Sequence, residues 1–187
     1  DKTTEASYIT SLREFSKQLE INFPLSKPRR MFSGWGMNLA RVGTEIAVRL
    51  AGNKGITGVV SPASIFSDQN SEKLRKWLLT EHAIQYIDYF PAETRLFDGV
   101  DQDCVNITIE PNKSGKKIYL SKFDADLNLQ EFQQSFDLSN SFLKSNGYVL
   151  PISLNNNQLN ELLRLSNLPK LGDWQGNNEG ELWTGRE

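Results

Sequence analysis

The residues of this sequence that could take part in chemistry lie in a few places, and the most informative place surrounds Phe97. Residues 90–103 read as a loop between two strand-like runs, and this loop carries Phe97. A phenylalanine ring in such a loop can pack against apolar neighbours such as Leu96 and Val100, or it can stack on a flat substrate. Open α/β sheets bind ligands at the carboxyl ends of their strands, which is where this loop begins. The residues alone leave both roles open.

Three other candidates near this loop favour structural roles. Asp98, Asp101 and Asp103 lie close together, but the loop lacks the further ligands and the bidentate carboxylate of a calcium site, so we expect solvated side chains and no metal. His82 is the single histidine, and we expect it to contact the last carbonyls of the preceding helix rather than to act as a base. Cys104 begins a strand, where a small buried apolar residue is expected.

A second candidate site is the basic loop at residues 21–36. It carries Lys27, Arg29 and Arg30 beside aromatic residues. Taken alone, this triplet is best explained as solvated surface, and the sharper interpretation is contact with nucleic-acid phosphates.

Composition limits the classes of protein. The chain has 187 residues, enough for one domain with a real core, and a net charge of −2, so any polyanion binding must come from local patches. No run approaches the roughly 18 apolar residues of a membrane span, and no signal-peptide pattern occurs, so we expect a cytoplasmic protein. The single cysteine excludes an internal disulfide and a cysteine-based zinc site. Phosphate-loop, zinc-protease and nucleophile-elbow motifs do not occur.

The elements that must position these residues alternate between helix and strand. Apolar periodicity predicts helices over 4–20, 37–51, 68–81 and 155–167, strands over 55–61, 83–89, 104–110 and 117–123, and a short helix over 128–136.

Finer expectations concern side-chain direction and strand pairing. In the helix at 37–51 we expect an inward face of Leu39, Val42, Ile46, Ala47 and Leu50. In the helix at 68–81 we expect Lys73, Arg75 and Lys76 to point largely outward. The strand at 104–110 follows its neighbour without a helix, so it should be antiparallel to the others, and the turn at 112–115 should pair it with 117–123 as a hairpin.

Residues 35–110 resemble the amino-type adenine-N6 DNA methyltransferases of restriction–modification systems. The resemblance is carried by NLARVGTEIAVRLAGNKGITGVVSPASIF, by the charged helix and strand after it, and by RLFDGVDQDCVNITI. In that family a helix rich in Ala, Val and Leu precedes a strand ending in a proline-containing turn, matched here by Val60-Ser61-Pro62. An aromatic residue then lies just before the last strand of the catalytic domain, and the matching residue is Phe97.

The resemblance implies a fold and a reaction. The fold class would be α/β, the downstream half of a Rossmann-like methyltransferase fold with a mixed sheet and a closing antiparallel strand. The reaction would be methyl transfer from S-adenosylmethionine to a flipped adenine, with Phe97 stacking on the base. Double-stranded DNA would be the partner, contacted at its phosphates by Lys27, Arg29 and Arg30, and a cognate restriction endonuclease is a further partner that the family admits.

The chain departs from the family where the chemistry takes place. It has neither the glycine-rich strand–turn motif that binds S-adenosylmethionine nor the Asn-Pro-Pro-aromatic tetrapeptide. In many relatives that tetrapeptide is followed by Asp-Lys and a helix, as at Asp1-Lys2 here. We therefore expect a fragment that begins just after the catalytic motif, contains no catalytic residue and is inactive alone.

The expected organisation has three parts. Residues 1–123 would be the second half of the catalytic domain, 124–170 a helical extension, and 171–187 the start of a target-recognition domain. Two alternatives stay open: a fragment of a protein or RNA methyltransferase on the same scaffold, and a non-catalytic, methyltransferase-like module for DNA binding or assembly.

Overall fold

The computed structural model describes residues 2–28, 37–115, 117–134 and 141–168. The chain falls into two compact units, Asp1–Ile152 and Ser153–Glu187. The residues expected to begin a target-recognition domain, 171–187, lie outside the described residues, and the expected boundaries stay predictions.

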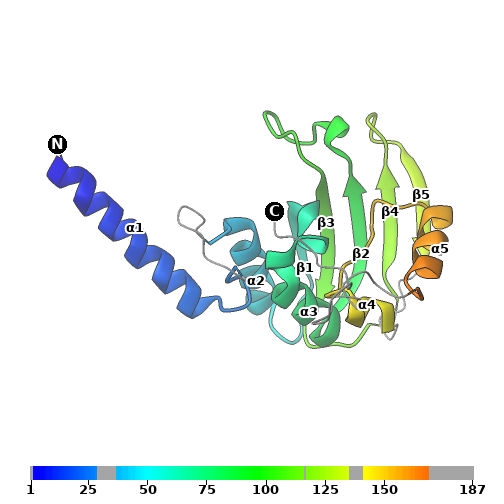
Figure 1. Cartoon of the computed structure of the whole chain (residues 1–187), viewed down its shortest axis with the longest axis horizontal. Coiled ribbons are helices and arrows are strands. Elements are labelled where there is room, and N and C mark those ends of the chain that lie inside the picture. Colours follow the sequence, from blue (N-terminus) through cyan, green and yellow to red (C-terminus); the bar gives the residue numbers. More distant parts are fainter. Residues whose placement is uncertain (1, 29–36, 116, 135–140, 169–187) are drawn as a thin grey trace, which may run out of the picture. The chain divides into compact units, whose positions relative to one another are not determined.

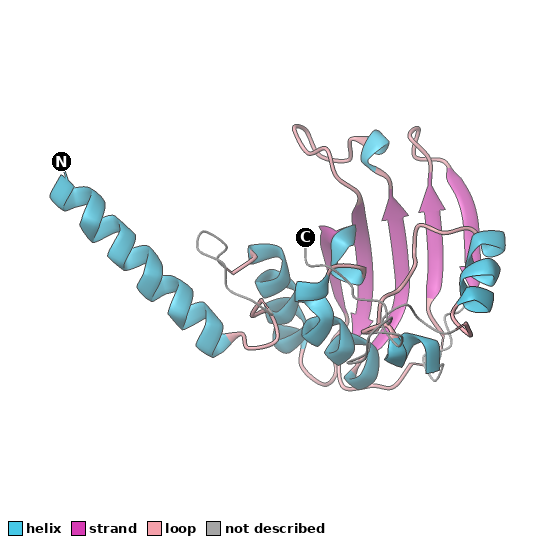
Figure 2. Ribbon diagram, viewed as in Figure 1, coloured by secondary structure: helices cyan, strands magenta, loops and turns pink. Residues whose placement is uncertain are grey.

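Figure 1 labels the helices and strands of the described residues, and Figure 2 colours them by type. The helices are α1 (Lys2–Asn22), α2 (Leu39–Ala51), α3 (Glu72–Glu81), α4 (Ser141–Ser145) and α5 (Asn156–Leu165), with short 3-10 helices η1 (Ala63–Phe66), η2 (Gln69–Ser71) and η3 (Ala92–Thr94). The strands are β1 (Thr57–Pro62), β2 (Ala83–Phe90), β3 (Cys104–Glu110), β4 (Tyr119–Phe123) and β5 (Leu129–Gln134).

The sheet of the first unit is mixed, with strand order β1-β3-β2-β4-β5. β3 is antiparallel to both of its neighbours, β1 and β2, and β4 is parallel to β2. Strands β1, β2 and β4 therefore point the same way, and α3 is the crossover between β1 and β2. This confirms the expected α/β fold with a mixed sheet, and it places the antiparallel strand β3 between two parallel ones.

The core lies on one face of this sheet. Ile87 of β2, Ile107 of β3 and Leu120 of β4 are at most 1% exposed, and α2 packs on β1 while α3 packs on β2. Burying side chains of this size is the main stabilising term of the unit. No helix in the described part of the chain is long and apolar enough to cross a membrane.

The predicted hairpin between 104–110 and 117–123 is wrong. Both edges of β3 are already paired, with β1 and with β2, so β4 has no edge of β3 to join and pairs with β2 instead. The connection from β3 to β4 must cross the amino end of β2. Gly115 makes this crossing possible, because a Cβ there would lie 3.0 Å from the Cβ of Ala83.

The predicted helix over 128–136 is also wrong, because residues 129–134 form β5, antiparallel to β4. The tight turn before β5 explains why a strand forms here and not a helix. The Asp124 carboxylate accepts hydrogen bonds from the backbone N–H groups of Asp126, at 3.0 Å, and of Asn128, at 2.9 Å. Aspartate turns of this kind favour chain reversal over helix initiation.

Helix α2 buries a different stripe from the expected one. Val42 is buried as expected, but Leu39 is 67% and Leu50 81% exposed, while Glu45 is fully buried. The loop after α1 makes this burial possible, since Ser26 donates to the Glu45 carboxylate from its backbone N–H, at 3.0 Å, and from its hydroxyl, at 2.8 Å. A buried carboxylate is tolerated when it is hydrogen-bonded and paired.

Arg75 was expected to point outward and is instead only 1% exposed. Its guanidinium donates to the backbone carbonyls of Ile65, Asp68 and Gly147 at 3.0, 2.8 and 2.9 Å. The three carbonyl groups satisfy the donors of the buried guanidinium. Through these bonds the Arg75 side chain joins the segment after β1 to the turn after α4.

Candidate functional site at the carboxyl edge of the sheet

The carboxyl ends of the parallel strands meet at one edge of the sheet, the upper edge in Figure 1. Pro62, at the end of β1, and Phe90, at the end of β2, both pair with Cys104 at the start of β3. The loop of residues 91–103, which connects β2 to β3, therefore lies where open α/β sheets bind ligands.

Phe97 begins a β-turn within this loop. Its carbonyl accepts a hydrogen bond from the Val100 N–H at 3.2 Å, and Gly99, the third residue of the turn, has φ of 71°. A positive φ at this place favours glycine. The formation of this turn therefore explains the glycine in the run Phe97-Asp98-Gly99-Val100.

Asp103 anchors the loop at its far end. Its carboxylate accepts hydrogen bonds from the Tyr89 hydroxyl at 2.6 Å and from the Ala92 N–H at 2.9 Å. Its backbone carbonyl accepts from the Ala63 N–H at 2.9 Å. One residue therefore joins β2, the start of the loop and the segment after β1. Burial, followed by the bond to Asp103, raises the pKa of Tyr89 well above its usual value.

Phe97 itself is 45% exposed. It lines an open pocket of 430 Å³ together with its loop neighbours Arg95, Asp98, Gly99, Val100 and Asp101. The apolar neighbour Phe90 stacks on Phe123 instead, with ring centroids 4.7 Å apart. The ring of Phe97 is therefore available to a flat ligand, and the pocket adds one guanidinium and two carboxylates.

The basic candidates are described only in part. Lys27 is 46% exposed at its side chain and forms an ion pair with Glu20 at 3.0 Å. It lines a separate pocket of 190 Å³ with α3 residues that include Lys73. Arg29 and Arg30 lie outside the described residues, so the three are not seen together.

Of the two remaining candidates, one is confirmed and one is wrong. Cys104 is buried, as expected. His82 does not contact the last carbonyls of α3; its Nδ1 accepts a hydrogen bond from the Asn112 N–H at 2.8 Å, and its ring meets Trp77 edge-on at 4.2 Å. Burial lowers the pKa of His82, which keeps Nδ1 free to accept.

The residues described at this edge do not fit S-adenosylmethionine by themselves. β1 continues through Pro62 into η1 rather than into a glycine-rich turn, and Gly99 serves the Phe97 turn. No group of three or more His, Cys, Asp or Glu that could hold a metal ion occurs within the described ranges.

The expectation of a solvated side chain is wrong for Asp103, which instead anchors this loop. The available signal was weak: an aspartate directly before a strand, with a tyrosine near the end of the preceding strand. Neither position reveals the pairing of β2 with β3 that brings the two side chains together.

A comparison of this mixed α/β sheet and its helices with solved structures finds restriction–modification proteins. The type IIG restriction endonuclease BpuSI is 17% identical over 83% of this chain, with a TM-score of 0.53. The EcoKI M protein of a type I restriction enzyme is 14% identical over 50% of the chain and 21% of its own, with a TM-score of 0.41. A type I methyltransferase subunit from Streptococcus thermophilus is 16% identical over 61% of the chain and 20% of its own, with a TM-score of 0.35.

The likeness to BpuSI shows a shared fold and nothing finer. The chain spans 20% of the length of BpuSI. No protein-family model matches the sequence. A search of curated proteins likewise finds no match.

Proposed function

We propose that this chain is the downstream part of the catalytic domain of an S-adenosylmethionine-dependent DNA adenine-N6 methyltransferase from a restriction–modification system. The observation that carries the proposal is the place of Phe97, an aromatic ring that is 45% exposed on the loop at the carboxyl end of β2. The fold shared with BpuSI, a type IIG restriction endonuclease, supports it.

Phe97 would form one wall of the pocket for the target base. The amino group of adenine is paired inside the duplex, so the base must leave the stack before it can react. Stacking on an aromatic side chain is worth roughly 1–3 kcal/mol per base, which offsets part of the cost of flipping. The hydrogen bonds that Asp103 accepts from Tyr89 and Ala92 hold the loop in place beforehand, so little conformational entropy is lost on binding.

Most other components of the reaction would come from outside the described residues. S-adenosylmethionine supplies the methyl group, and its site would lie elsewhere in the complete protein. Arg29 and Arg30, with Lys27, would contact phosphates of double-stranded DNA, although Lys27 would have to leave Glu20 to do so. A cognate endonuclease and a cytoplasmic location belong to the same proposal.

The test replaces Phe97 in the full-length protein. Adenine methylation of unmodified genomic DNA by radiolabelled S-adenosylmethionine gives kcat/KM, and fluorescence of 2-aminopurine at a mapped target position reports base flipping. We expect Phe97→Ala to lower kcat/KM by roughly 5- to 150-fold, the equivalent of about 1–3 kcal/mol, and to reduce the fluorescence change. Phe97→Trp should keep most of both, because tryptophan also stacks.

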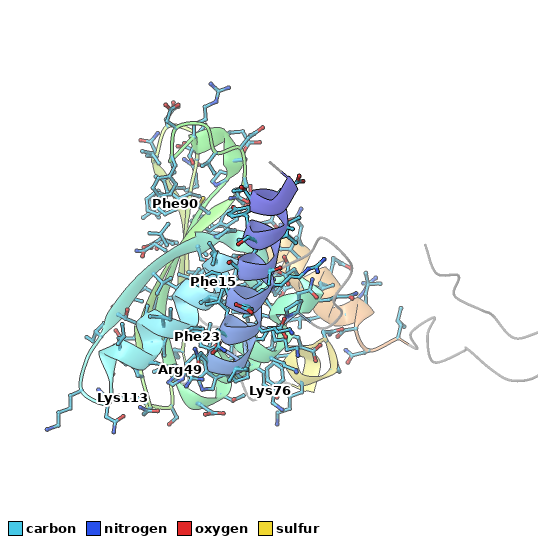
Figure 3. All side chains as sticks on the ribbon, turned by 90° about the vertical axis from the view of Figure 1, so that its left-hand side faces the viewer. Phe15, Phe23, Arg49, Lys76, Phe90 and Lys113 are labelled. Atoms are coloured by element: carbon cyan, nitrogen blue, oxygen red, sulfur yellow. The ribbon has the colours of Figure 1, made fainter. Side chains whose placement is uncertain are left out.

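Phe15→Ala is the matched control, since Phe15 is a comparably exposed phenylalanine on α1, labelled in Figure 3. It should leave both readouts unchanged. Equal activity of Phe97→Ala and the wild type would show that the ring does not touch the base. Methylation of protein or RNA but not DNA by the wild type would show that the substrate class is wrong.

A further inference from the structure

A second pocket lies at the opposite end of the sheet, and the strand order creates it. Because β3 and β4 lie on either side of β2, their connection, described at residues 111–115 and 117–118, crosses the amino end of β2. In Figure 1 this connection runs along the lower edge of the sheet. Gly115 lies directly against Ala83, and Asn112, where the connection begins, donates to His82. The connection is thus held close to the first residues of β2.

Two tyrosines form the aromatic part of this pocket. Tyr86 of β2 and Tyr119 of β4 are register partners, and their rings stack with centroids 5.4 Å apart and planes inclined by 26°. The residues next to them, Ile87 and Leu120, are buried on the helix-covered face. Since side chains alternate along a strand, the tyrosines lie on the other face, where Tyr86 stays 45% exposed.

The crossing connection brings cations and hydrogen-bonding groups to these rings. Lys113 is 59% exposed at its side chain and pairs with Glu110 at 2.6 Å. The same carboxylate accepts a hydrogen bond from the Gln85 side-chain amide. Lys117 is exposed and forms no ion pair with any other described residue. Together these groups line an open pocket of 480 Å³, which is within the usual size of small-molecule sites.

We propose that this pocket binds a nucleotide, with its base stacked on Tyr86 and its phosphate at the ammonium groups of Lys113 and Lys117. The nucleotide is either free or one unit of a single strand. Sheet-surface aromatics beside basic side chains bind single-stranded nucleic acid by this combination of stacking and charge. Gln85 and Glu110 offer an amide and a carboxylate to the edge of the base.

The charge of the lining favours a nucleotide over a protein helix. The pocket has two ammonium groups and one carboxylate, so a bound phosphate would neutralise the remaining positive charge. An apolar helix laid on the tyrosines would instead bury Lys117 without a partner, which is costly.

The site does not depend on the proposed methyltransferase function. It lies at the end of the sheet remote from the Phe97 loop, as the labelled Lys113 and Phe90 in Figure 3 show. Sites that share no contacts have additive effects on binding, so the two can be tested separately in one protein.

The test measures binding of fluorescein-labelled oligothymidylate to the full-length protein by anisotropy, in a Phe97→Ala background. We expect Tyr86→Ala to weaken binding about tenfold, and Tyr86→Phe to stay within about twofold of the background, because the ring remains. Lys117→Ala should weaken binding several-fold and reduce the slope of log affinity against log salt by about 0.7, the value for one single-strand phosphate contact. Thermal unfolding checks that each variant is folded.

Tyr8→Ala and Lys144→Ala are the matched controls, because both residues are exposed and remote from the pocket in sequence. Both should bind as the background does. Competition with adenosine monophosphate distinguishes a free nucleotide from a unit of a single strand. Displacement of the oligonucleotide at similar concentration shows a site for free nucleotides. Binding of the oligonucleotide without such displacement shows a single-strand site. Unchanged binding in both Tyr86→Ala and Lys117→Ala overturns the proposal. So does equally tight binding of hexaglutamate that Tyr86→Ala leaves unaffected.

Crosslinking gives a direct second readout in the wild-type protein. An oligonucleotide containing 5-iodouracil should crosslink on irradiation to the tryptic peptide 77–95, which contains Tyr86. Phe97 falls in the next peptide, 96–113, because trypsin cleaves after Arg95. Sequencing of the crosslinked peptides locates the modified residue, and crosslinks found at Phe97 but not at Tyr86 contradict the proposal.

Discussion

At the scale of single residues, Asp103 fixes the position of the loop that carries the candidate site. Its carboxylate serves two donors, the Tyr89 hydroxyl and the Ala92 N–H, and its carbonyl serves a third, the Ala63 N–H. Phe97 would touch the proposed base, but the bonds to Asp103 hold the loop in its place. It is therefore a positioning residue.

We expect Asp103→Asn to lower the free energy of unfolding by about 1–3 kcal/mol, because an amide offers one acceptor where the carboxylate offers two. Urea unfolding measures this loss, and hydrogen exchange of the Ala92 amide should accelerate. Asp101→Asn is the control, since Asp101 is an exposed carboxylate of the same loop with no hydrogen bond to another described residue. Equal unfolding free energies for the two variants would mean that the loop holds its place without Asp103.

At the scale of elements, local patterns predicted most helices and strands but not how they pair. β1, β2, β3, α2 and α3 were predicted from periodicity close to their observed bounds. The pairing partner of β4 was predicted wrongly, because pairing depends on which strand edges are free. The inward face of α2 was also missed, because Ser26 makes the burial of Glu45 possible from a separate loop.

The crossing connection between β3 and β4 should be sensitive to acid, since neutral His82 accepts the hydrogen bond of Asn112. Burial lowers the pKa of His82 in the folded state, with the charge of Glu81 opposing, so the unfolded chain takes up a proton first. This contribution to stability is complete above the unfolded pKa, about 6.5, and is lost as the pH falls below it.

His82→Gln tests this expectation, because glutamine can accept the same bond without titrating. The unfolding free energy of the wild type should fall between about pH 7 and pH 5 by more than that of His82→Gln. Parallel curves for the two proteins would assign the acid sensitivity to other groups.

At the scale of the whole molecule, the sheet has an outer strand with little of the usual protection of an edge beyond Pro62 at its end. β1 is at the end of the sheet among the described residues, and its sequence TGVVSP contains no charged residue. Val60 is 55% exposed. Natural edge strands carry charges, bulges or a cover that prevent pairing with another chain. The chain spans 20% of BpuSI, so the proposed methyltransferase would have further residues that can supply such a cover.

We therefore expect the outer edge of β1 to pair with a further strand in the full-length protein. Along β1, alternate backbone N–H groups point toward β3 and toward the outer edge. The exchange rates of the amides that face β3 therefore serve as the reference for those that face outward. If the edge is paired, hydrogen exchange should be comparably slow for the two sets of amides. Rapid exchange confined to the outer set would show an open edge and would contradict the placement of this chain as half of a larger sheet.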